Sequence, residues 1–292
     1  MNSLTDTVEA LVQKVGHATA LDRVARPLSK AVAKVVEPRT VKDLLSGRWL
    51  GHPLHPMLTD LPIGSWTSAF VLDLVGGKAG RKAADTLVGF GVLTALPTVA
   101  AGLSDWSDTM GEERRIGLVH AGGNAVALAC YTSSWVLRKK GKRAKGVAMG
   151  MLGATAATVG GYLGGHLSYR NGVGVDRNAW THGETEWTKV MPEVELRPGE
   201  PATAMVGDER VLLVREASGV TVIGDVCSHA GGPLHEGSVA DGCVTCPWHG
   251  SVFRLSDGGV EHGPATGPQP AYDVRVTGGQ VEVRRRGSPS LR

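Results

Sequence analysis

The stretch Asp225–Asp257, DVCSHAGGPLHEGSVADGCVTCPWHGSVFRLSD, decides the fold of the C-terminal part of this 292-residue chain. It holds two short motifs, Cys227-Ser-His229 and Cys246-Pro-Trp-His249, with sixteen residues between them. Two thiolates and two imidazoles on two loops suit a tetrahedral zinc ion. They equally suit an iron–sulfur centre in which two cysteines hold one iron and two histidines hold the other. The ligand types alone leave both metals open.

A further pair, Cys243-Val-Thr-Cys246, has the Cys-x-x-Cys spacing that is common in zinc sites. The residues around the motifs carry a more specific pattern, C-x-H-x16-C-P-W-H-G-S-x-F, which extends to Gly231 and to the segment Gly263–Ala265. This pattern resembles the Rieske ferredoxins and the Rieske domains of oxygenases, and the resemblance covers residues 190–285. It favours a [2Fe–2S] cluster over zinc.

The resemblance implies a role for each residue of the motifs. Cys227 and Cys246 would ligate the inner iron, and His229 and His249 would ligate the outer, solvent-near iron. Ser251 occupies the position whose hydroxyl donates to a bridging sulfide in the high-potential members. Imidazole in place of thiolate leaves less negative charge at the metal, which raises the reduction potential relative to an all-cysteine cluster.

Three positions depart from the high-potential, respiratory-complex pattern. Gly232 and Trp248 stand where those members carry two extra cysteines, so their disulfide is missing here. Phe253 stands where they carry a tyrosine whose hydroxyl donates to a ligand sulfur. Because one donor fewer stabilises the reduced charge, we expect a lower-potential, ferredoxin-like cluster. Cys243 is interpreted as a buried strand thiol and not as a ligand.

Long apolar runs precede this domain. Thr86–Ser104, Gly117–Leu137 and Gly146–Tyr169 contain 19, 21 and 24 residues without Asp, Glu, Lys or Arg. Met57–Gly77 is a fourth run, with two aspartates near its ends. Each run approaches the ~20 residues that cross ~30 Å of hydrocarbon. The runs predict four transmembrane helices, and the alternative is a set of buried helices in a large soluble domain.

From about residue 190 the pattern changes to short alternating runs such as RVLLVRE and QVEVRRR, which are typical of antiparallel strands. We therefore predict a multidomain membrane protein, a four-transmembrane-helix bundle followed by an all-β Rieske domain. The Rieske domain is expected to be an antiparallel β sandwich with a cluster-binding subdomain. Pro27 and Pro38 are expected to interrupt the helices of the N-terminal arm. The predicted divisions are an amphipathic, charged arm (1–50), the transmembrane domain (51–172), a linker (173–189), the Rieske domain (190–285) and a tail (286–292).

Four histidines mark the predicted membrane domain: His52 and His55 in GHPLHP, His120, and His166. If each apolar run crosses the membrane once, all four lie toward the same face, and the Rieske domain follows on that face. Ionisable residues in membrane segments are costly and are therefore functional candidates. A haem b, a quinone or proton-relay site, or a non-haem metal could use them. The plain alternative is that each histidine caps a helix at the interface.

The layout GHPLHP–LPIG–SDW–VHAGGN–GGHLxYRxGVGV over residues 48–175 also resembles an uncharacterised family of four-helix membrane domains, sometimes fused to Rieske domains. That family has no assigned chemistry, so the resemblance supports the architecture alone.

Composition narrows the function. A net charge of +3 does not indicate a nucleic-acid binder, and four cysteines exclude a disulfide-rich secreted scaffold. A terminal oxygenase needs a soluble domain with two histidines and a carboxylate at an open iron site, and the region before residue 190 is occupied by the apolar runs. We expect an electron carrier or an oxidoreductase component more than a stand-alone enzyme.

These observations favour a membrane-anchored Rieske electron-transfer protein. It would pass electrons between a redox partner, such as a ferredoxin or a reductase, and the histidine-lined site. The alternatives are a haem- or quinone-linked membrane oxidoreductase with its site at those histidines, and a membrane-anchored redox sensor. The expected surroundings are membrane lipid and not nucleic acid.

The expected location is a bacterial-type cytoplasmic membrane. Basic residues in the 78–82 and 138–145 loops place the far side in the cytoplasm by the positive-inside rule. The missing disulfide instead suits a reducing compartment for the cluster domain, and no good twin-arginine signal for export precedes it. On this argument we expect the Rieske domain on the cytoplasmic side.

Overall fold

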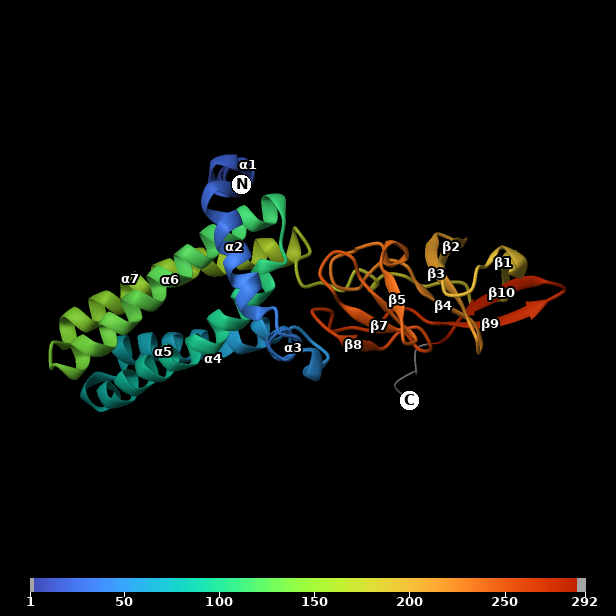
Figure 1. Cartoon of the computed structure of the whole chain (residues 1–292). Coiled ribbons are helices and arrows are strands. Elements are labelled where there is room, and N and C mark those ends of the chain that lie inside the picture. Colours follow the sequence, from blue (N-terminus) through green and yellow to red (C-terminus); the bar gives the residue numbers. More distant parts are fainter. Residues whose placement is uncertain (1–2, 288–292) are drawn as a thin grey trace. The chain divides into compact units, whose positions relative to one another are not determined.

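The computed structural model describes residues 3–287 as a helical part followed by β-sheets (Figure 1). The chain divides into two compact units. The helical unit comprises Met1–Pro38 and Leu54–Val173, and the β unit comprises Arg39–Pro53 and Gly174–Arg292. Residues 1–2 of the predicted arm and residues 288–292 of the predicted tail lie outside the described residues. The segment Arg39–Pro53, which precedes the first long helix in the chain, therefore belongs to the β unit.

The helical unit is built from two short N-terminal helices and four long ones. The four apolar runs of the sequence are all helical, and tight turns at glycines of positive φ (Gly77, Gly111 and Gly141) separate the long helices. The most extensive contacts join α4 to α5 and α6 to α7. The elements are α1 (Ser3–His17), η1 (Thr19–Leu21), α2 (Asp22–Val36), α4 (Leu54–Val75), α5 (Gly77–Ser107), α6 (Gly111–Lys139) and α7 (Arg143–Tyr169).

Aromatic rings lie against glycines in the core of the helical unit. Trp66 of α4 stacks on Tyr131 of α6 with ring centroids 4.0 Å apart and an interplanar angle of 8°. A Cβ on Gly91 of α5 would lie 2.3 Å from the Trp66 ring nitrogen, so only glycine admits the indole there. The abundance of small residues in the apolar runs thus permits close helix packing.

Two of the described helices, α5 and α7, are long and apolar enough to cross a membrane. Their most apolar windows are only 39% and 22% buried, whereas a core helix of a soluble protein would be mostly buried. The other two long helices, α4 and α6, are helical as predicted, and their crossing of a membrane remains a prediction.

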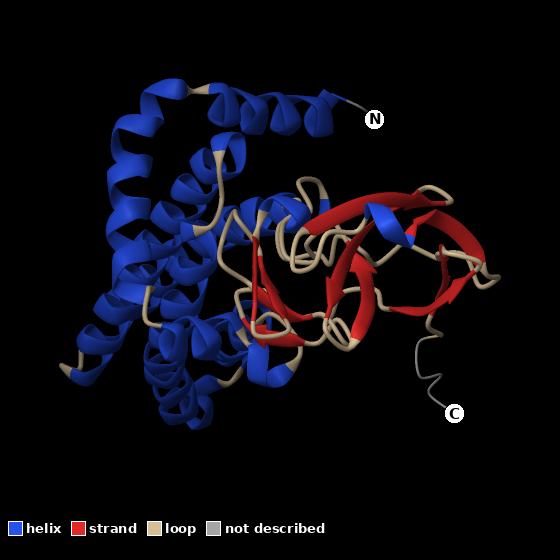
Figure 2. Ribbon diagram, turned by 45° about the vertical axis from the view of Figure 1, so that its right-hand side comes forward, coloured by secondary structure: helices blue, strands red, loops and turns tan. Residues whose placement is uncertain are grey.

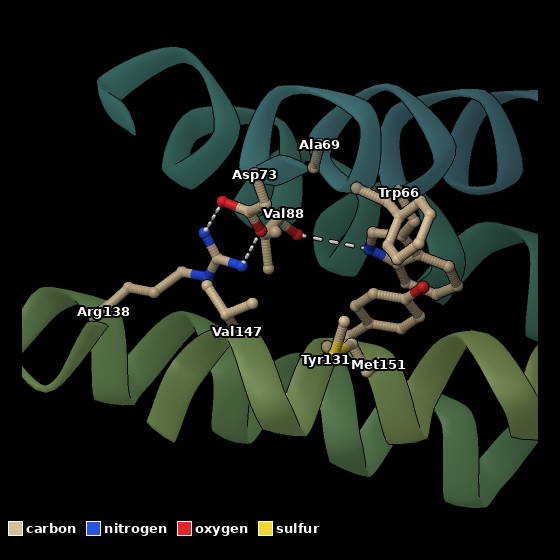
Figure 3. A pocket seen from close by; sticks show the side chains of 10 residues that line it. Trp66, Ala69, Asp73, Val88, Tyr131, Arg138, Val147 and Met151 are labelled. Atoms are coloured by element: carbon tan, nitrogen blue, oxygen red, sulfur yellow. Dashed lines mark hydrogen bonds and ion pairs between the residues drawn. The ribbon is translucent and has the colours of Figure 1, made fainter. Parts of the chain in front are cut away.

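A group of four charged residues, one from each long helix, lies inside the helical unit. Arg138 of α6 pairs with Asp73 of α4 (Figure 3). Arg138 also pairs with Asp85 of α5 at 2.9 Å. Arg143 of α7 pairs with the same two carboxylates at 2.5 and 2.6 Å. The side chains of Arg138 and Asp73 are only 1% and 6% exposed, whereas those of Arg143 and Asp85 are 23% and 31% exposed, so the network has a buried pair and a half-buried pair. A small pocket lined by the Trp66–Tyr131 stack adjoins it (Figure 3).

The N-terminal arm is helical, and only one of the two prolines expected to interrupt it does so. Pro38 does separate α2 from the next helix, but α2 runs through Pro27, so the expected interruption there is wrong. Proline removes only one backbone hydrogen bond. The helix is held on both sides of it, because Ala25 and Ser29 are buried and the Ser29 hydroxyl donates to Ser107 O of α5 at 3.2 Å.

The described part of the β unit consists of antiparallel strands (Figure 2), with one α-helix and three short 3-10 helices. In the described part of the chain the sheet orders are β1-β10-β9, β2-β3-β4 and β5-β6-β7-β8. The helical elements are α3 (Arg39–Ser46), η2 (Arg48–Leu50), η3 (Glu193–Glu195) and η4 (Leu234–Glu236). The strands are β1 (Thr188–Pro192), β2 (Pro201–Val206), β3 (Glu209–Glu216), β4 (Gly219–Gly224), β5 (Ser238–Ala240), β6 (Cys243–Thr245), β7 (Val252–Arg254), β8 (Val260–His262), β9 (Tyr272–Thr277) and β10 (Gln280–Arg285).

Strand β3 lies between two hydrophobic cores. Successive side chains of a strand point to opposite faces. Val211 and Leu213 accordingly pack into one core with residues of β9 and β10. Leu212 and Val214 pack into the other core with Cys227 and Cys246. The continuous apolar run of β3 therefore serves both layers, and the second layer carries the two cysteine loops.

Candidate iron–sulfur site

Two loops that close in the same way carry the four predicted ligands. In the first loop, which follows β4, Cys227 N–H donates to Gly232 O at 2.9 Å and Gly231 N–H donates to Cys227 O at 2.8 Å. In the second loop, between β6 and β7, Cys246 N–H donates to Ser251 O at 2.8 Å and Gly250 N–H donates to Cys246 O at 3.1 Å.

A glycine four residues after each cysteine makes this closure possible. Gly231 has φ +84° and Gly250 has φ +74°, a left-handed conformation that L side chains rarely adopt. The spacing from cysteine to glycine is the same in both loops. The local sequence thus builds two equivalent turns that face each other.

The two thiols lie together in the core. Cys227 is 1% exposed and Cys246 is 3% exposed. The Cys227 thiol donates to Cys246, which lowers the pKa of the Cys246 thiol to about 6 against the opposing effect of burial. The same hydrogen bond, together with burial, raises the pKa of Cys227. The hydrogen bond therefore favours the thiolate form of Cys246, which is the form that binds metal.

Backbone amides surround the two sulfurs. The N–H groups of His229 and Ala230 donate to Cys227, and those of Trp248 and His249 donate to Cys246. Hydrogen bonds to the charged form favour the thiolate. The residues that follow each cysteine therefore stabilise negative charge at sulfur through the main chain.

The two imidazoles form a second pair nearer the surface. The rings of His229 and His249 are 5.1 Å apart between centroids and nearly perpendicular, at 89°. Both residues are partly exposed, whereas the cysteines are buried. Trp248, 47% exposed, lies edge-on to His249 at 6.4 Å.

This two-and-two arrangement fits a cluster with two irons. Within residues 3–287, no three His, Cys, Asp or Glu side chains gather around a point that could hold one metal ion. A tetrahedral zinc site needs four ligands around one ion, whereas a Rieske cluster needs a cysteine pair and a histidine pair. Cys243, the third cysteine of the region, lies on β6 as expected but is half-buried. The ligand types and their pairing both suit the cluster.

Gly232 and Ser251 lie directly beside the cysteines. A Cβ on Gly232 would lie 2.8 Å from the Cys246 sulfur and 3.1 Å from the Trp248 ring, so the loops approach too closely for a side chain there. Ser251 is fully buried, and its hydroxyl accepts the N–H of Ala265 at 3.0 Å. A hydroxyl that accepts one hydrogen bond still has its own proton to donate.

One polar group beside the first loop was not anticipated. Asp225 is fully buried and accepts from His235, through the backbone N–H at 2.8 Å and through Nδ1 at 2.7 Å. Arg210 Nε donates to the same carboxylate at 2.5 Å. His235 thus ties the loop to Asp225. The sequence offered one signal, an acidic residue directly after a buried strand.

Two of the four membrane-domain histidines, His55 and His120, are each hydrogen-bonded to a backbone carbonyl in the same way. His55 Nδ1 lies 2.9 Å from Thr98 O, and His120 Nδ1 lies 2.8 Å from Gly160 O. A carbonyl only accepts, so in both rings Nδ1 carries the proton and Nε2 is the basic nitrogen. The two rings are close enough to interact electrostatically.

The other two histidines lie elsewhere. His166 Nδ1 is 3.9 Å from a carboxylate oxygen of Glu9 on α1, which also pairs with Arg170. His52 is exposed and belongs to the β unit, not to the helical unit. The structure therefore brings His55 and His120 near each other and does not group His52 with them.

Comparison with known proteins identifies both parts of the chain. The model of the Rieske [2Fe-2S] domain matches residues 186–273, and that of the predicted membrane protein family DUF2231 matches residues 51–177. The anthranilate 1,2-dioxygenase ferredoxin subunit of Burkholderia cepacia is 35% identical over 98 residues, which are 34% of this chain and 91% of that protein.

Two further relatives match the same region. The cytochrome b6-f complex iron-sulfur subunit of Chlorobaculum tepidum is 28% identical over 94 residues, 32% of this chain and 51% of that subunit. The solved ferredoxin of carbazole 1,9a-dioxygenase from Nocardioides aromaticivorans IC177 is 30% identical, with a TM-score of 0.33, and the match covers 34% of this chain and 98% of that one. The chain therefore belongs to the Rieske [2Fe-2S] family through residues 186–273 and carries a DUF2231 membrane-protein domain at residues 51–177.

Proposed function

We propose that this protein is a membrane-anchored electron carrier whose cluster is held by Cys227, His229, Cys246 and His249. The pairing of two buried thiols and two partly exposed imidazoles on equivalent loops carries the proposal. A [2Fe–2S] cluster, when bound, supplies one-electron storage at a potential set by its ligands and hydrogen bonds.

The surrounding residues would protect and tune that centre. The amides that donate to Cys227 and Cys246 offset negative charge on sulfur, and the apolar core around the thiols keeps water away. The imidazole pair lies at the partly exposed side of the site. Electrons would therefore enter and leave through the side of His229 and His249.

The surface of the helical unit supports the membrane anchor. Large apolar side chains are exposed on all four long helices, and exposed apolar surface of this extent indicates contact with lipid or protein. They include Ile63 and Leu74 of α4, Phe90, Leu93 and Leu96 of α5, Val126 and Val136 of α6, and Met151, Leu152 and Val159 of α7. Arg138 and Asp73 of the charged network, in contrast, are buried among these helices. All four helices would then cross the bilayer.

The partners follow from the chemistry of the relatives. Two relatives are ferredoxins of dioxygenase systems, and one is an iron-sulfur subunit of a cytochrome complex. The partner on the cluster side would be a redox protein such as a ferredoxin or a reductase. The pair His55 and His120 of the membrane domain would bind the second redox group, such as a quinone, that exchanges electrons with the cluster. The proposed setting is a bacterial-type cytoplasmic membrane with the cluster on the cytoplasmic side.

A quinone-linked oxidoreductase is the second candidate function. The hydrogen bonds that hold His55 and His120 to backbone carbonyls favour it. Each ring donates Nδ1–H to a backbone carbonyl and keeps Nε2 as an acceptor or ligand. Asn124 lies 3.1 Å from His120 Nε2 and adds a polar group. Such nitrogens can hydrogen-bond a quinol or, alternatively, ligate haem.

Replacing His120 by Ala is expected to distinguish a quinol-binding site from a haem site. In the detergent-purified protein, we expect the reduced-minus-oxidised visible spectrum to show broad iron–sulfur bleaching in wild type and variant alike. Reduction of the oxidised cluster by a soluble quinol analogue is expected to slow about tenfold, because a hydrogen bond of roughly 1.5 kcal/mol from the quinol hydroxyl to His120 Nε2 is lost. Stopped-flow absorbance measures the rate.

His182→Ala, in the exposed segment before β1, is the matched control and should leave the rate unchanged. A rate that does not respond to His120→Ala would reject the quinone site. A sharp α band that disappears in His120→Ala would assign haem in its place.

Phe253→Tyr is expected to raise the midpoint potential of the cluster. Phe253 is fully buried in the same core cluster as Cys227 and Cys246. A hydroxyl donor to a ligand sulfur stabilises the reduced cluster by about 1 kcal/mol, which corresponds to about 40 mV for one electron. Redox titration followed by EPR measures the potential, and an unchanged or lower value would contradict the hydrogen-bond argument.

A further inference from the structure

The β unit includes a segment that is far from the cluster loops in sequence. Arg39–Pro53, which contains α3 and η2, groups with the strands and not with the helices that precede and follow it. It contacts the stretch Val260–Ala265 through Val260 and His262 of β8 and through Gly263. Within this stretch, the N–H of Ala265 donates to Ser251 beside the second cysteine loop, so an added element against the stretch can influence the site.

Asp43 of α3 makes the central contacts. Its Oδ1 accepts the backbone N–H of Gly263 at 2.7 Å. Its Oδ2 lies 3.0 Å from Nδ1 of His262. Arg48 lies 3.6 Å from the same carboxylate and also donates to Val260 O at 3.5 Å. One side chain thus binds two successive residues of the stretch, and an arginine holds that side chain in place.

The backbone itself comes close at this point. A Cβ on Gly263 would lie 2.8 Å from Ser46 Oγ and 3.3 Å from Asp43 Oδ1. The Ser46 hydroxyl in turn donates to Asp43 O at 3.4 Å. Glycine at 263 therefore lets α3 rest directly on the main chain of the stretch.

The contacts continue from Gly263 to the cysteine loop. Two residues after Gly263, the N–H of Ala265 donates to Ser251 Oγ at 3.0 Å. The carbonyl of Ser251 accepts the N–H of Cys246 at 2.8 Å. Ala265 and Ser251 are both buried, so neither group has water as a substitute partner.

From this chain of contacts we infer that Asp43 is a positioning residue for the iron–sulfur site. Its carboxylate holds the Gly263 amide, which fixes Ala265 against the Ser251 hydroxyl and so directs the hydroxyl proton of Ser251. The inference rests on the cluster proposed above. We therefore expect the reduction potential of the cluster to depend on α3, the α-helix that precedes α4 in the chain.

Two neutral substitutions of Asp43 distinguish the effect of its hydrogen bond to Gly263 from the effect of its negative charge. Asp43→Asn removes the negative charge and keeps a carbonyl oxygen that can accept from Gly263. Asp43→Ala removes both. Because the two variants have the same charge, any difference in midpoint potential between them reports the lost hydrogen bond. The difference in midpoint potential between Asp43→Asn and wild type reports the effect of the negative charge.

The experiment is an EPR-monitored redox titration of the full-length protein in detergent. At a fixed potential near the midpoint, we expect the ratio of reduced to oxidised cluster to be about fivefold lower in Asp43→Ala than in Asp43→Asn, the effect of one hydrogen bond of ordinary strength. In a Ser251→Ala background this difference should vanish, because the hydroxyl through which Asp43 acts is gone. A difference that persists there would overturn the route through Ser251.

Hydrogen exchange gives a second readout that does not depend on the cluster. The Gly263 amide is expected to exchange about tenfold faster in Asp43→Ala than in Asp43→Asn. Asp208→Asn, at the exposed turn between β2 and β3, is the matched control and should change neither exchange nor potential. If Asp43→Ala does not retain iron, Asp43→Ser replaces it as the neutral variant with a shortened side chain.

The outcomes distinguish this inference from the proposed function. A wild-type protein without a Rieske-type EPR signal would remove the cluster assignment and the inference with it. A wild-type signal with equal potentials in Asp43→Ala and Asp43→Asn would overturn the role of Asp43 alone.

Discussion

Cys246→Ser is expected to abolish the rhombic, low-average-g EPR signal of the reduced protein and to release its bound iron. Cys246 is buried, its pKa is lowered to about 6, and its sulfur accepts hydrogen bonds from the Cys227 thiol and from the amides of Trp248 and His249. A serine hydroxyl there is far more difficult to deprotonate than a thiol, so one iron would lose a ligand. EPR of the dithionite-reduced protein, with an iron assay, measures both effects.

Cys243→Ser is the matched control, since Cys243 lies on the same hairpin only three residues away. Its thiol is half-buried on β6, and burial, together with the charge of Glu261, raises its pKa. We expect this variant to keep full iron content and an unchanged signal. Loss of the signal in Cys243→Ser and not in Cys246→Ser would reverse the ligand assignment.

Arg138→Leu is expected to destabilise the helical unit by about 3 kcal/mol, because removing one partner leaves buried charge uncompensated. Arg138 holds Asp73 and Asp85, and after the change only Arg143 remains to neutralise two carboxylates. The Arg138 side chain also donates to the buried Ser134 hydroxyl at 3.1 Å. Thermal unfolding in detergent, followed by circular dichroism, should show a midpoint lower by roughly 10 °C.

Lys139→Leu is the control, because Lys139 is the exposed neighbour of Arg138 on the same helix. It removes the same charge from the same turn and should leave the midpoint within about 1 °C. Adding Asp73→Asn to Arg138→Leu should recover part of the loss, because one arginine then faces one carboxylate. Equal midpoints for Arg138→Leu and wild type would show that the network contributes nothing to stability.

The local elements follow directly from patterns in the sequence. The alternating and apolar runs after residue 190 predict strands, and β3, β4, β9 and β10 occupy them because strand periodicity is a property of adjacent residues. The four apolar runs are helical for the same reason. The pairing of cysteine and histidine in two loops is equally local, since each Cys-to-Gly spacing closes its own turn.

The candidate site was less completely predictable than its ligands. The four predicted ligands lie in the two facing loops, and Ser251 lies beside them. The roles of Asp225 and His235 depend on how the first loop folds back on itself. Among the membrane-domain histidines, an argument from counted crossings places all four on one face, whereas the compact units separate His52 from the other three.

By itself, the sequence determined the helices, the strands, the family and the two cysteine–histidine motifs, since each depends on the spacing of nearby residues. Only the tertiary structure decided which distant residues support them. Asp43 meets Gly263 across 220 positions, and Arg138 meets Asp73 across 65. No local pattern records such a partner, because the contact exists only after helices and sheets have packed and buried polar groups have found one another.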